Sequence, residues 1–344
     1  MPMEAEPRPA AEQLRGQRVV VTGGSGFIGA HVVARLCRLG ASVVSVDRRP
    51  APPFRCHPDA GHAGHSEHVG HGEHAGHGEH AVTVVEGDLR DAAVVDAAVQ
   101  PGAQSIVHLA AQTQVLRSIE DPQGTFDNNV VVTGALLEKA RQHGASTFVL
   151  ASTNAVVGAG ATGTLHEAVP LAPLTPYGAT KAAAEMNVSC YNAAYGVRGV
   201  ALRFTNVYGP GMSEKDSIVP RLMRVAASGA RFDIYGDGKQ VRDYVNVADV
   251  VQAIVVSLTN PEISGPLVIG AGSSVSVLDL VELVESALRS SLHVNHIPGK
   301  VGEMPAVIVD NSRARGWGWA PSVSLEDGLA EVAREWGAKD GTDS

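Results

Sequence analysis

The feature that most constrains the fold is a glycine-rich turn between a short apolar strand and a helix. Residues 19–29 read VVVTGGSGFIG, which predicts a strand that ends before Gly23 and a helix that begins at Gly26. Gly23 permits the tight turn, Gly26 lets the backbone approach a pyrophosphate, and Gly29 lets the helix pack closely on the strand. Glycine turns also serve packing alone, so this motif by itself is a weak signal for a bound dinucleotide.

Beyond this turn, short apolar runs alternate with longer helical patterns, which predicts βαβ units and a parallel sheet. Strands are expected at 18–22, 42–46, 82–86, 105–108, 146–151 and 199–203, and helices at 26–39, 92–99 and 124–143. After Tyr208 the alternation becomes irregular and richer in glycine and proline. We therefore expect a smaller lobe over the carboxyl edge of the sheet, where such folds bind ligands.

These patterns give a fold class and boundaries. We expect an α/β protein with a Rossmann-like, doubly wound parallel sheet and a smaller C-terminal α/β lobe. The expected parts are a disordered N-terminus at 1–17, a dinucleotide-binding domain at 18–206, a lobe at 207–338 with segments that interleave with the sheet, and a tail at 339–344. With 44% hydrophobic residues among 344, the chain can bury a core of this size.

Charge and cysteine content exclude several classes of partner. The formal net charge of −9 leaves no basic stripe that could neutralise a nucleic-acid backbone. No apolar run is long enough to span a membrane, and residues 1–16 lack the apolar core of a signal peptide. Cys37, Cys56 and Cys190 have neither metal-ligand nor redox spacing. We expect a cytoplasmic protein without nucleic-acid or membrane partners.

One segment, predicted as an insertion at 57–81, departs from the α/β pattern. From His62 to His80 a histidine recurs at every third position, among glycine, alanine and glutamate. This period fits neither a helix nor a strand, and few apolar residues are available to bury, so we expect disorder. The alternative is opportunistic binding of Zn²⁺ or Ni²⁺ by neutral imidazoles. Neither interpretation gives the segment a catalytic role, and no catalytic metal is expected.

Two carboxylates follow predicted strands at positions that suit a dinucleotide. Asp47 ends the second strand, at the spacing where a carboxylate accepts hydrogen bonds from an adenosine ribose. A carboxylate there would repel a 2′-phosphate, which favours NAD over NADP, although Arg48 stands beside it. Asp88 follows the third strand and is expected to bind the adenine amino group, to cap the next helix, or to do both.

A phenol and an ammonium are predicted to share one helix face. Tyr177 and Lys181 are four residues apart in a helical stretch that continues to Ala194. A nearby cation favours the phenolate form of tyrosine, so Lys181 is expected to lower the pKa of Tyr177. Ser152 and Thr153 end a predicted strand at the carboxyl edge of the sheet, where a hydroxyl could share the reacting proton with the phenol.

Five further segments complete the pattern. They are Val107-His-Leu-Ala-Ala111, Asp127-Asn-Asn-Val with Thr133, Arg203-Phe-Thr-Asn206-Val-Tyr-Gly-Pro, Tyr235-Gly-Asp-Gly-Lys-Gln-Val-Arg242-Asp-Tyr, and Lys300-Val-Gly-Glu303-Met-Pro-Ala-Val307. With the glycine turn and the Tyr-to-Lys spacing, the chain resembles an extended short-chain dehydrogenase/reductase of the NAD-dependent epimerase/dehydratase family, most similar to UDP-sugar 4-epimerases, over roughly residues 18 to 335.

The resemblance implies site residues. The implied catalytic residues are Thr153, Tyr177 and Lys181. The implied NAD-binding residues are Gly23, Gly26, Phe27, Ile28, Gly29, Asp47, Arg48, Asp88, Leu89, Leu109, Ala110, Ala111, Tyr177 and Lys181. The residues implied to bind a nucleotide-diphosphate sugar are Thr153, Asn206, Tyr235, Arg242, Lys300, Glu303 and Val307. One departure is Val156-Val157-Gly158, where the family usually has Val-Tyr-Gly.

The resemblance also implies an activity: 4-epimerisation of a UDP-hexose such as UDP-glucose by transient oxidation at C4. Related 4,6-dehydratases carry Asp-Glu directly after the catalytic threonine, where this chain has Asn154 and Ala155, so dehydration is disfavoured. A glucuronate 4-epimerase stays an alternative, although Asn206 stands where that subfamily tends to have threonine, and so does another nucleotide-sugar dehydratase or reductase. The alternative of another class is a non-catalytic NAD-binding sensor, which would not need the catalytic residues.

The family resemblance further predicts a homodimer. In related proteins, the helices that correspond to residues 124–143 and 176–195 of this chain form a four-helix bundle between two subunits. The alternative is that the apolar faces of these helices serve only the core of the monomer.

Overall fold

The computed structural model describes residues 9–52, 54, 82–158, 163–298 and 307–340. The histidine-rich segment lies outside these residues, so the expectations for its disorder and metal binding stay predictions. Within the described part of the chain, no group of three His, Cys, Asp or Glu side chains could hold a metal ion. None of the helices described is long and apolar enough to cross a membrane.

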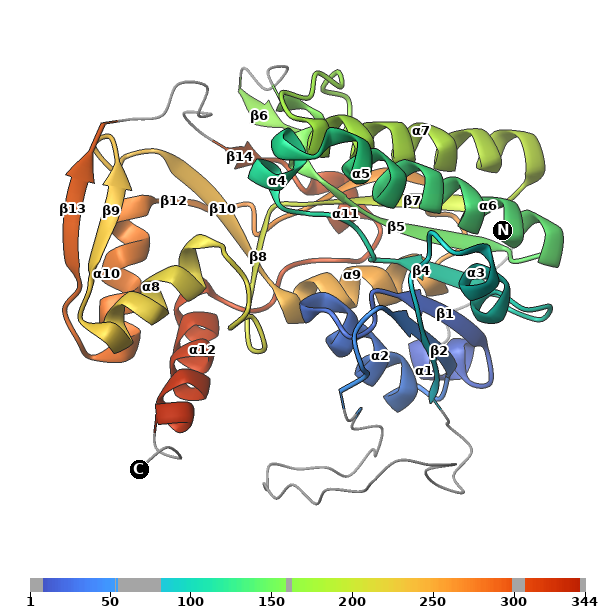
Figure 1. Cartoon of the computed structure of the whole chain (residues 1–344), viewed down its shortest axis with the longest axis horizontal. Coiled ribbons are helices and arrows are strands. Elements are labelled where there is room, and N and C mark those ends of the chain that lie inside the picture. Colours follow the sequence, from blue (N-terminus) through green and yellow to red (C-terminus); the bar gives the residue numbers. More distant parts are fainter. Residues whose placement is uncertain (1–8, 53, 55–81, 159–162, 299–306, 341–344) are drawn as a thin grey trace, which may run out of the picture.

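A seven-stranded parallel sheet forms the larger part of the molecule (Figure 1). Its order is β11-β7-β5-β4-β1-β2-β3, with bounds β1 Arg18–Thr22, β2 Ser42–Asp47, β3 Val82–Glu86, β4 Ser105–His108, β5 Thr147–Thr153, β7 Arg198–Phe204 and β11 Gly265–Ile269. The strand order reverses between β1 and β4, which creates the crevice typical of a doubly wound fold. The expected fold class is confirmed.

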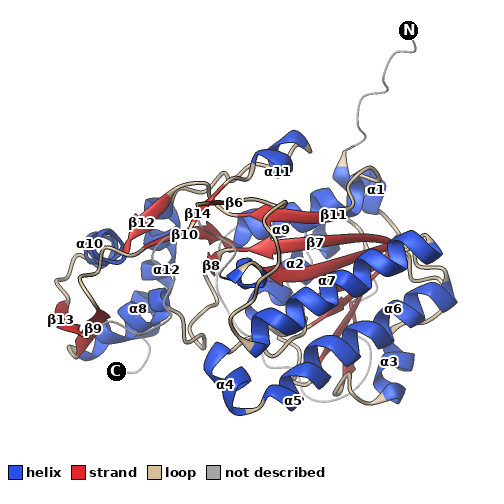
Figure 2. Ribbon diagram, turned by 90° about the horizontal axis from the view of Figure 1, so that it is seen from above, coloured by secondary structure: helices blue, strands red, loops and turns tan. Residues whose placement is uncertain are grey.

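Helices cover both faces of the sheet (Figure 2). On one face lie α2 (Phe27–Arg38) and α9 (Val247–Thr259), whose apolar side chains share a core with the sheet. On the other face lie α3 (Ala92–Ala98), α6 (Val132–His143) and α7 (Pro176–Tyr195). Because both faces are covered, the central strands are nearly continuous runs of buried residues, as their apolar sequences predict.

The smaller lobe has its own apolar core. Its strands are β8 Asn206–Tyr208, β9 Arg231–Tyr235, β10 Val241–Asn246, β12 Ser274–Ser276 and β13 His293–Ile297, and its helices are α8 Ile218–Ser228, α10 Val277–Leu288 and α12 Leu325–Asp340. A two-stranded pair, β6 (Thr164–Leu165) with β14 (Ile308–Val309), and the short helix α11 (Ser312–Gly316) complete the chain. Since β11 and α9 pack with the sheet, segments after residue 206 interleave with it.

Three helical segments of the structure differ from the sequence-based expectation. Within the N-terminus predicted as disordered, residues Ala10–Leu14 form the helix α1, because the Leu14 side chain is buried in the core beneath α2 and α9. The helix predicted at 124–143 consists of α5 (Pro122–Phe126), a π-helical turn at Asp127–Val131 and α6. The preceding helix α4 (Val115–Glu120) was not expected. A π turn inside a helix often marks a functional site, and this one borders the site described below.

The contact between α2 and the turn after β1 gives a stability prediction. A Cβ at Gly29 would overlap the carbonyl oxygen of Gly23. We expect Gly29→Ala to lower the free energy of unfolding by about 1–3 kcal/mol, because the helix must move away from the turn. The measurement is equilibrium denaturation. The matched control is Gly337→Ala on α12, where a Cβ meets open space; equal stability of the two variants would contradict the prediction.

Candidate functional site

A pocket opens at the carboxyl ends of β1, β2 and β4, above the glycine turn. It is lined by Gly23, Gly26, Val46, Asp47, Arg48, Arg49, Gly87, Asp88, Leu89, Leu109, Ala110, Ala111, Thr113, Asn128, Val132 and Lys215. Nine of the residues predicted to bind the dinucleotide are among them. Gly23 has a φ of +73° and Gly26 is the N-cap of α2, so the turn directs the helix N-terminus at the pocket.

Three residues at the start of α2 that were predicted to bind the cofactor do not line this pocket. Gly29 packs against the backbone of Gly23. The Ile28 side chain packs against the core under α2, and Phe27 packs against the lobe core and against the ring of His31. In the structure these residues therefore place the helix, while the backbone of the turn faces the pocket.

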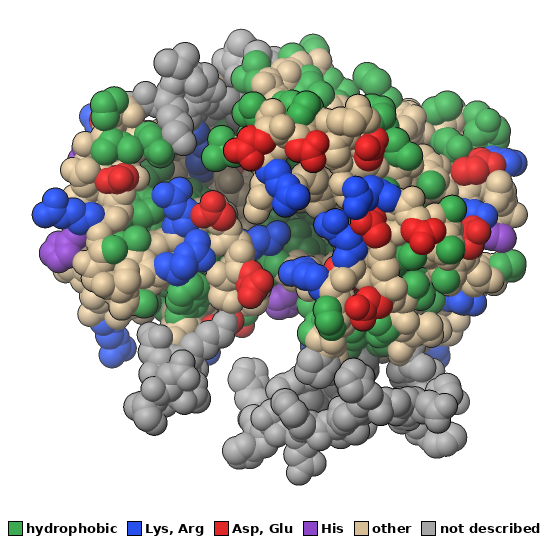
Figure 3. Space-filling model, viewed as in Figure 1, with side chains coloured by type: hydrophobic (Ala, Val, Ile, Leu, Met, Phe, Trp, Pro, Cys, Tyr) green, Lys and Arg blue, Asp and Glu red, His purple; other side chains and the backbone are tan. Residues whose placement is uncertain are grey.

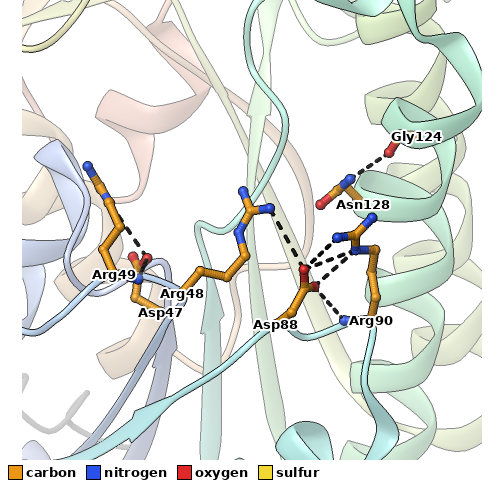
Figure 4. A network of polar contacts seen from close by, with 7 residues as sticks. All are labelled: Asp47, Arg48, Arg49, Asp88, Arg90, Gly124 and Asn128. Atoms are coloured by element: carbon orange, nitrogen blue, oxygen red, sulfur yellow. Dashed lines mark hydrogen bonds and ion pairs between the residues drawn. The ribbon is translucent and has the colours of Figure 1, made fainter.

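Asp47 organises the glycine turn from the end of β2. Its carboxylate accepts a hydrogen bond from the Ser25 backbone N–H at 3.1 Å and one from the Arg49 backbone N–H at 3.0 Å. The Arg49 Nε lies 3.7 Å from the same carboxylate (Figure 4). The carboxylate therefore connects the strand that carries it to the turn that precedes α2.

Asp88 lies across the pocket from Asp47 and is held by arginines (Figure 4). Arg90 donates to it from its backbone N–H and its guanidinium, and Arg48 lies 3.8 Å away. The hydrogen bond from the Arg90 side chain is the main reason that the pKa of Asp88 is lowered. The expectation that Asp88 caps the next helix is wrong, because Asp91 is the N-cap of α3 and accepts from the Ala93 N–H.

A buried histidine fixes the wall formed by residues 109–111. His108 lies between Thr22, whose Oγ1 is 2.7 Å from Nδ1, and Thr133, whose Oγ1 is 3.1 Å from Nε2. Burial lowers the pKa of His108 to about 3, with a further contribution from the charge of Lys181. The neutral ring can donate to one threonine and accept from the other. The Ala110 N–H also donates to Thr22 Oγ1 at 3.2 Å, which ties the wall to β1.

The three predicted catalytic residues are brought together by β5 and α7. Thr153 is the last residue of β5, and Tyr177 and Lys181 lie on the first turns of α7. Helix α7 begins where it does because Thr175 caps it and Pro176 occupies its first position. A Cβ at Gly178 would lie 2.6 Å from the Ala155 carbonyl oxygen, so glycine lets the helix approach the end of β5.

Burial governs the ionisation of Tyr177 and Lys181. Burial raises the pKa of Tyr177 to about 12, while a hydrogen bond with Thr153 acts in the opposite direction. The pKa of Tyr177 is therefore raised overall, and the lowering expected from Lys181 stays a prediction. Burial lowers the pKa of Lys181 to about 8, against the opposing charge of Glu185. The Lys181 Nζ donates to the Ala151 carbonyl at 2.9 Å.

Ser152 has a different partner from Thr153. Its hydroxyl donates to Glu185, which also forms a buried ion pair with Arg203 at 2.8 Å. The alternating direction of side chains along β5 separates the two neighbouring hydroxyls. Of the two candidates from the sequence, Thr153 therefore interacts with the phenol, and Ser152 belongs to the ion-pair network.

The residues predicted to bind the substrate lie mainly in the lobe. Asn206 and Arg242 are on the adjacent strands β8 and β10, where the Asn206 amide donates to the Asp243 carbonyl at 2.9 Å. Tyr235 ends β9. Val307 is only 3% exposed and packs in an apolar cluster. Lys300 and Glu303 lie outside the described residues, so their roles stay predictions.

Four polar residues that line the pocket were not identified from the sequence. They are Arg49, Thr113, Asn128 and Lys215. Arg49 follows Asp47 closely and could have been found by its position in the chain. Asn128 lies on the π-helical turn, and Lys215 lies in the loop after β8, so only tertiary structure brings these two to the pocket.

Comparisons with known proteins agree with this geometry. A model of the NAD-dependent epimerase/dehydratase family matches residues 19–270. A dTDP-glucose 4,6-dehydratase from Streptomyces griseus is 32% identical over 317 residues, which cover 91% of this chain and 92% of that protein. The structure of MoeE5 in complex with UDP-glucuronic acid and NAD is 31% identical, with a TM-score of 0.79 over 94% of this chain and 99% of that one. The UDP-glucose 4-epimerase of Thermus thermophilus, in complex with NAD, is 29% identical, with a TM-score of 0.79 over 93% and 99% of the two chains.

The cofactor is NAD, as it is for the family and in these structural neighbours. The pocket fits this cofactor. Gly26 keeps the turn open where a pyrophosphate approaches, the first N–H groups of α2 are directed there, and a carboxylate ends β2.

We propose that Asp47 binds the adenosine ribose, and this gives a prediction. Asp47→Ala should weaken NAD binding at least about tenfold, because it removes a charge-assisted acceptor and leaves the Ser25 N–H unpaired. The measurement is titration calorimetry with NAD. Asp91→Ala is the matched control, since it removes a carboxylate that only caps α3 and should lower stability by about 1 kcal/mol without changing NAD affinity. An Asp47→Ala protein with unchanged affinity would refute the assignment.

Proposed function

Because the chain belongs to the NAD-dependent epimerase/dehydratase family, we propose that it is a nucleotide-sugar 4-epimerase that acts on a UDP-hexose such as UDP-glucose. The observation that carries the proposal is the group formed by Thr153, Tyr177 and Lys181 beside two residues that cannot ionise, Asn154 and Ala155. The first three residues suit proton exchange with a sugar hydroxyl. The other two decide between epimerisation and dehydration.

Dehydration needs an additional acid and base to remove water across C5 and C6. In related dehydratases these are the Asp-Glu pair after the catalytic threonine. In this chain Asn154 and Ala155 begin a short 3₁₀ turn there, and the Ala155 backbone N–H donates to Thr153 Oγ1 at 3.2 Å. An amide and a methyl group cannot exchange a proton at neutral pH. Although dehydratases are among the relatives of this chain, this difference favours an epimerase.

The proposed mechanism uses each of the three residues. Tyr177, as the phenolate, takes the proton from the sugar O4 hydroxyl and later returns it, and Thr153 hydrogen-bonds to the phenol. Bound NAD would supply a reversible hydride acceptor for the sugar C4, with hydride return to the opposite face, and a positive ring charge that would favour the phenolate. Lys181, with a pKa of about 8, is mostly protonated at neutral pH and adds a second positive charge. The raised pKa of Tyr177 makes these charges necessary.

Arg242 and Asn206 are proposed to bind the diphosphate of the substrate. They lie on the adjacent strands β10 and β8, which extend from the carboxyl edge of the sheet into the lobe. A guanidinium and an amide supply N–H donors of the kind that phosphate oxygens accept. This arrangement would place the sugar between the lobe and the end of β5, where Thr153 lies.

The substrate is tested by incubating the protein with UDP-, dTDP- and GDP-sugars, UDP-glucuronate included, and separating the products. We expect conversion of UDP-glucose to UDP-galactose. UDP-glucuronate belongs in the panel because a neighbouring structure contains it. A product with a 4-keto-6-deoxy sugar, or no conversion of any UDP-sugar, would contradict the proposal.

The role of Tyr177 gives the next prediction. Tyr177→Phe should reduce turnover by about 10²–10⁴-fold, because it removes the proton acceptor and keeps the ring. NAD affinity, measured separately, should change little. A matched control is Tyr235→Phe at the end of β9, which removes a phenol of the lobe and should affect KM more than turnover. Turnover of the Tyr177 variant within twofold of the unsubstituted enzyme would rule out this role.

We also propose that two copies of the chain associate through α6 and α7. Large apolar side chains are exposed on these helices and on the segments packed against them: Leu116, Ile119, Phe126, Val131, Met186 and Tyr195. Exposed apolar side chains on neighbouring helices are typical of an interface between subunits. Helices α4 to α7 lie along one side of the molecule, so this face is accessible (Figure 2).

Light scattering tests the dimer. We expect a mass of about twice the 35.7 kDa of one chain at micromolar concentration. Met186→Lys should shift the mass toward that of one chain, since it places a charge in the apolar contact and the side chain is 62% exposed in the monomer. Arg334→Gln, on the exposed side of α12, should leave the mass unchanged. A mass near 35.7 kDa for the unsubstituted protein would disprove the dimer.

A further inference from the structure

Two basic side chains from distant parts of the chain meet at the mouth of the dinucleotide pocket. Arg49 follows β2, and Lys215 lies in the loop between β8 and α8. Both line the same pocket as Gly26. One side chain belongs to the sheet domain and the other to the lobe. Lys and Arg side chains gather around the hollow between these two parts on this face of the molecule (Figure 3).

Arg49 lies directly at the glycine turn. Its Nη2 donates to the Ser25 carbonyl at 2.9 Å, and a Cβ at Gly26 would lie 3.6 Å from the same nitrogen. The guanidinium is therefore beside the N-terminus of α2, where the helix dipole and free N–H groups favour a phosphate. Asp47 is 3.7 Å from the Arg49 Nε, and the Arg49 side chain is 56% exposed.

The loop that carries Lys215 is anchored over the same helix. The His31 ring on α2 hydrogen-bonds to the Pro210 carbonyl at 2.9 Å. Arg224 on α8 donates to the carbonyls of Ser213 and Lys215. Among the described residues, no ion pair joins the Lys215 ammonium to a carboxylate. The Lys215 side chain reaches the surface, but desolvation by the pocket wall, followed by the positive charge of Arg49, lowers the pKa of Lys215.

Two positive charges at the mouth of one pocket repel, and an anion between them offsets this repulsion. We propose that Arg49 and Lys215 hold a phosphate of the bound dinucleotide between them, so that the lobe contacts the cofactor through a side chain. The ligand chemistry is a phosphate oxygen that accepts charge-assisted hydrogen bonds. The phosphate is the pyrophosphate of NAD, and titration with NADPH tests the 2′-phosphate as the competing source.

The experiment measures cofactor binding without any sugar, so its outcome is independent of the proposed activity. Arg49→Gln, Lys215→Gln and the double variant are titrated with NADH and with NADPH by fluorescence, and with adenosine by competition. Arg334→Gln on the exposed side of α12 removes the same charge at a residue that does not line the pocket and serves as the control. Both pocket side chains are at the surface, and thermal denaturation checks that the variants fold.

We expect each single substitution to raise the Kd of NADH about tenfold, the change that corresponds to about 1.4 kcal/mol, and to leave adenosine binding unchanged. An equal loss of affinity for NADH and NADPH shows that Arg49 and Lys215 contact the pyrophosphate. A loss of affinity for NADPH alone overturns the assignment, because the two side chains would then contact a 2′-phosphate and not the pyrophosphate. Unchanged affinity for both dinucleotides overturns the proposal, since the side chains would then contact no phosphate. An affinity for adenosine that falls as much as that for the dinucleotides overturns it for the same reason.

Discussion

The structure depends on the close approach of α2 to the turn that follows β1. Only glycine at position 29 leaves room for the Gly23 carbonyl, and this contact fixes the direction in which the helix N-terminus points. The pocket exists because the N-terminus, the end of β2 and the wall after β4 meet there. Asp47 adds a polar connection by binding the Ser25 N–H. A local steric constraint thus determines where a large charged cofactor can bind.

A second constraint is the burial of charge at the end of β5. Burial disfavours the charged form of both side chains there. It raises the pKa of Tyr177 to about 12 and lowers the pKa of Lys181 to about 8. The ion pair of Glu185 and Arg203 lies close by and uses the hydroxyl of Ser152. The chain therefore supplies the proton-transfer group in its resting, protonated form. In the proposed mechanism, the positive charges of the cofactor and Lys181 make the phenolate accessible at neutral pH.

The sequence predicted the parts of the fold that depend on local patterns. The central strands were identified because burial on both faces requires continuous apolar runs. The strand β11 was missed because it follows the irregular lobe, and α1 was missed because Leu14 is the only buried residue of this short helix. In the candidate site, too, the sequence predicted residues that belong to local motifs and missed residues that tertiary contacts bring there. Motif spacing identified Tyr177, whereas the position of Lys215 depends on a loop anchored by contacts with α2 and α8.

The central claim is that hydride leaves and returns to the same sugar carbon, because no acid/base pair follows Thr153. The most direct measurement uses UDP-glucose with deuterium at C4, incubated with the enzyme in ordinary water and analysed by NMR and mass spectrometry. The account predicts UDP-galactose that retains the deuterium at C4 and has the same mass as the substrate. A product that has lost one water and carries the deuterium at C6 would contradict it, because hydride would then have returned to a different carbon after dehydration.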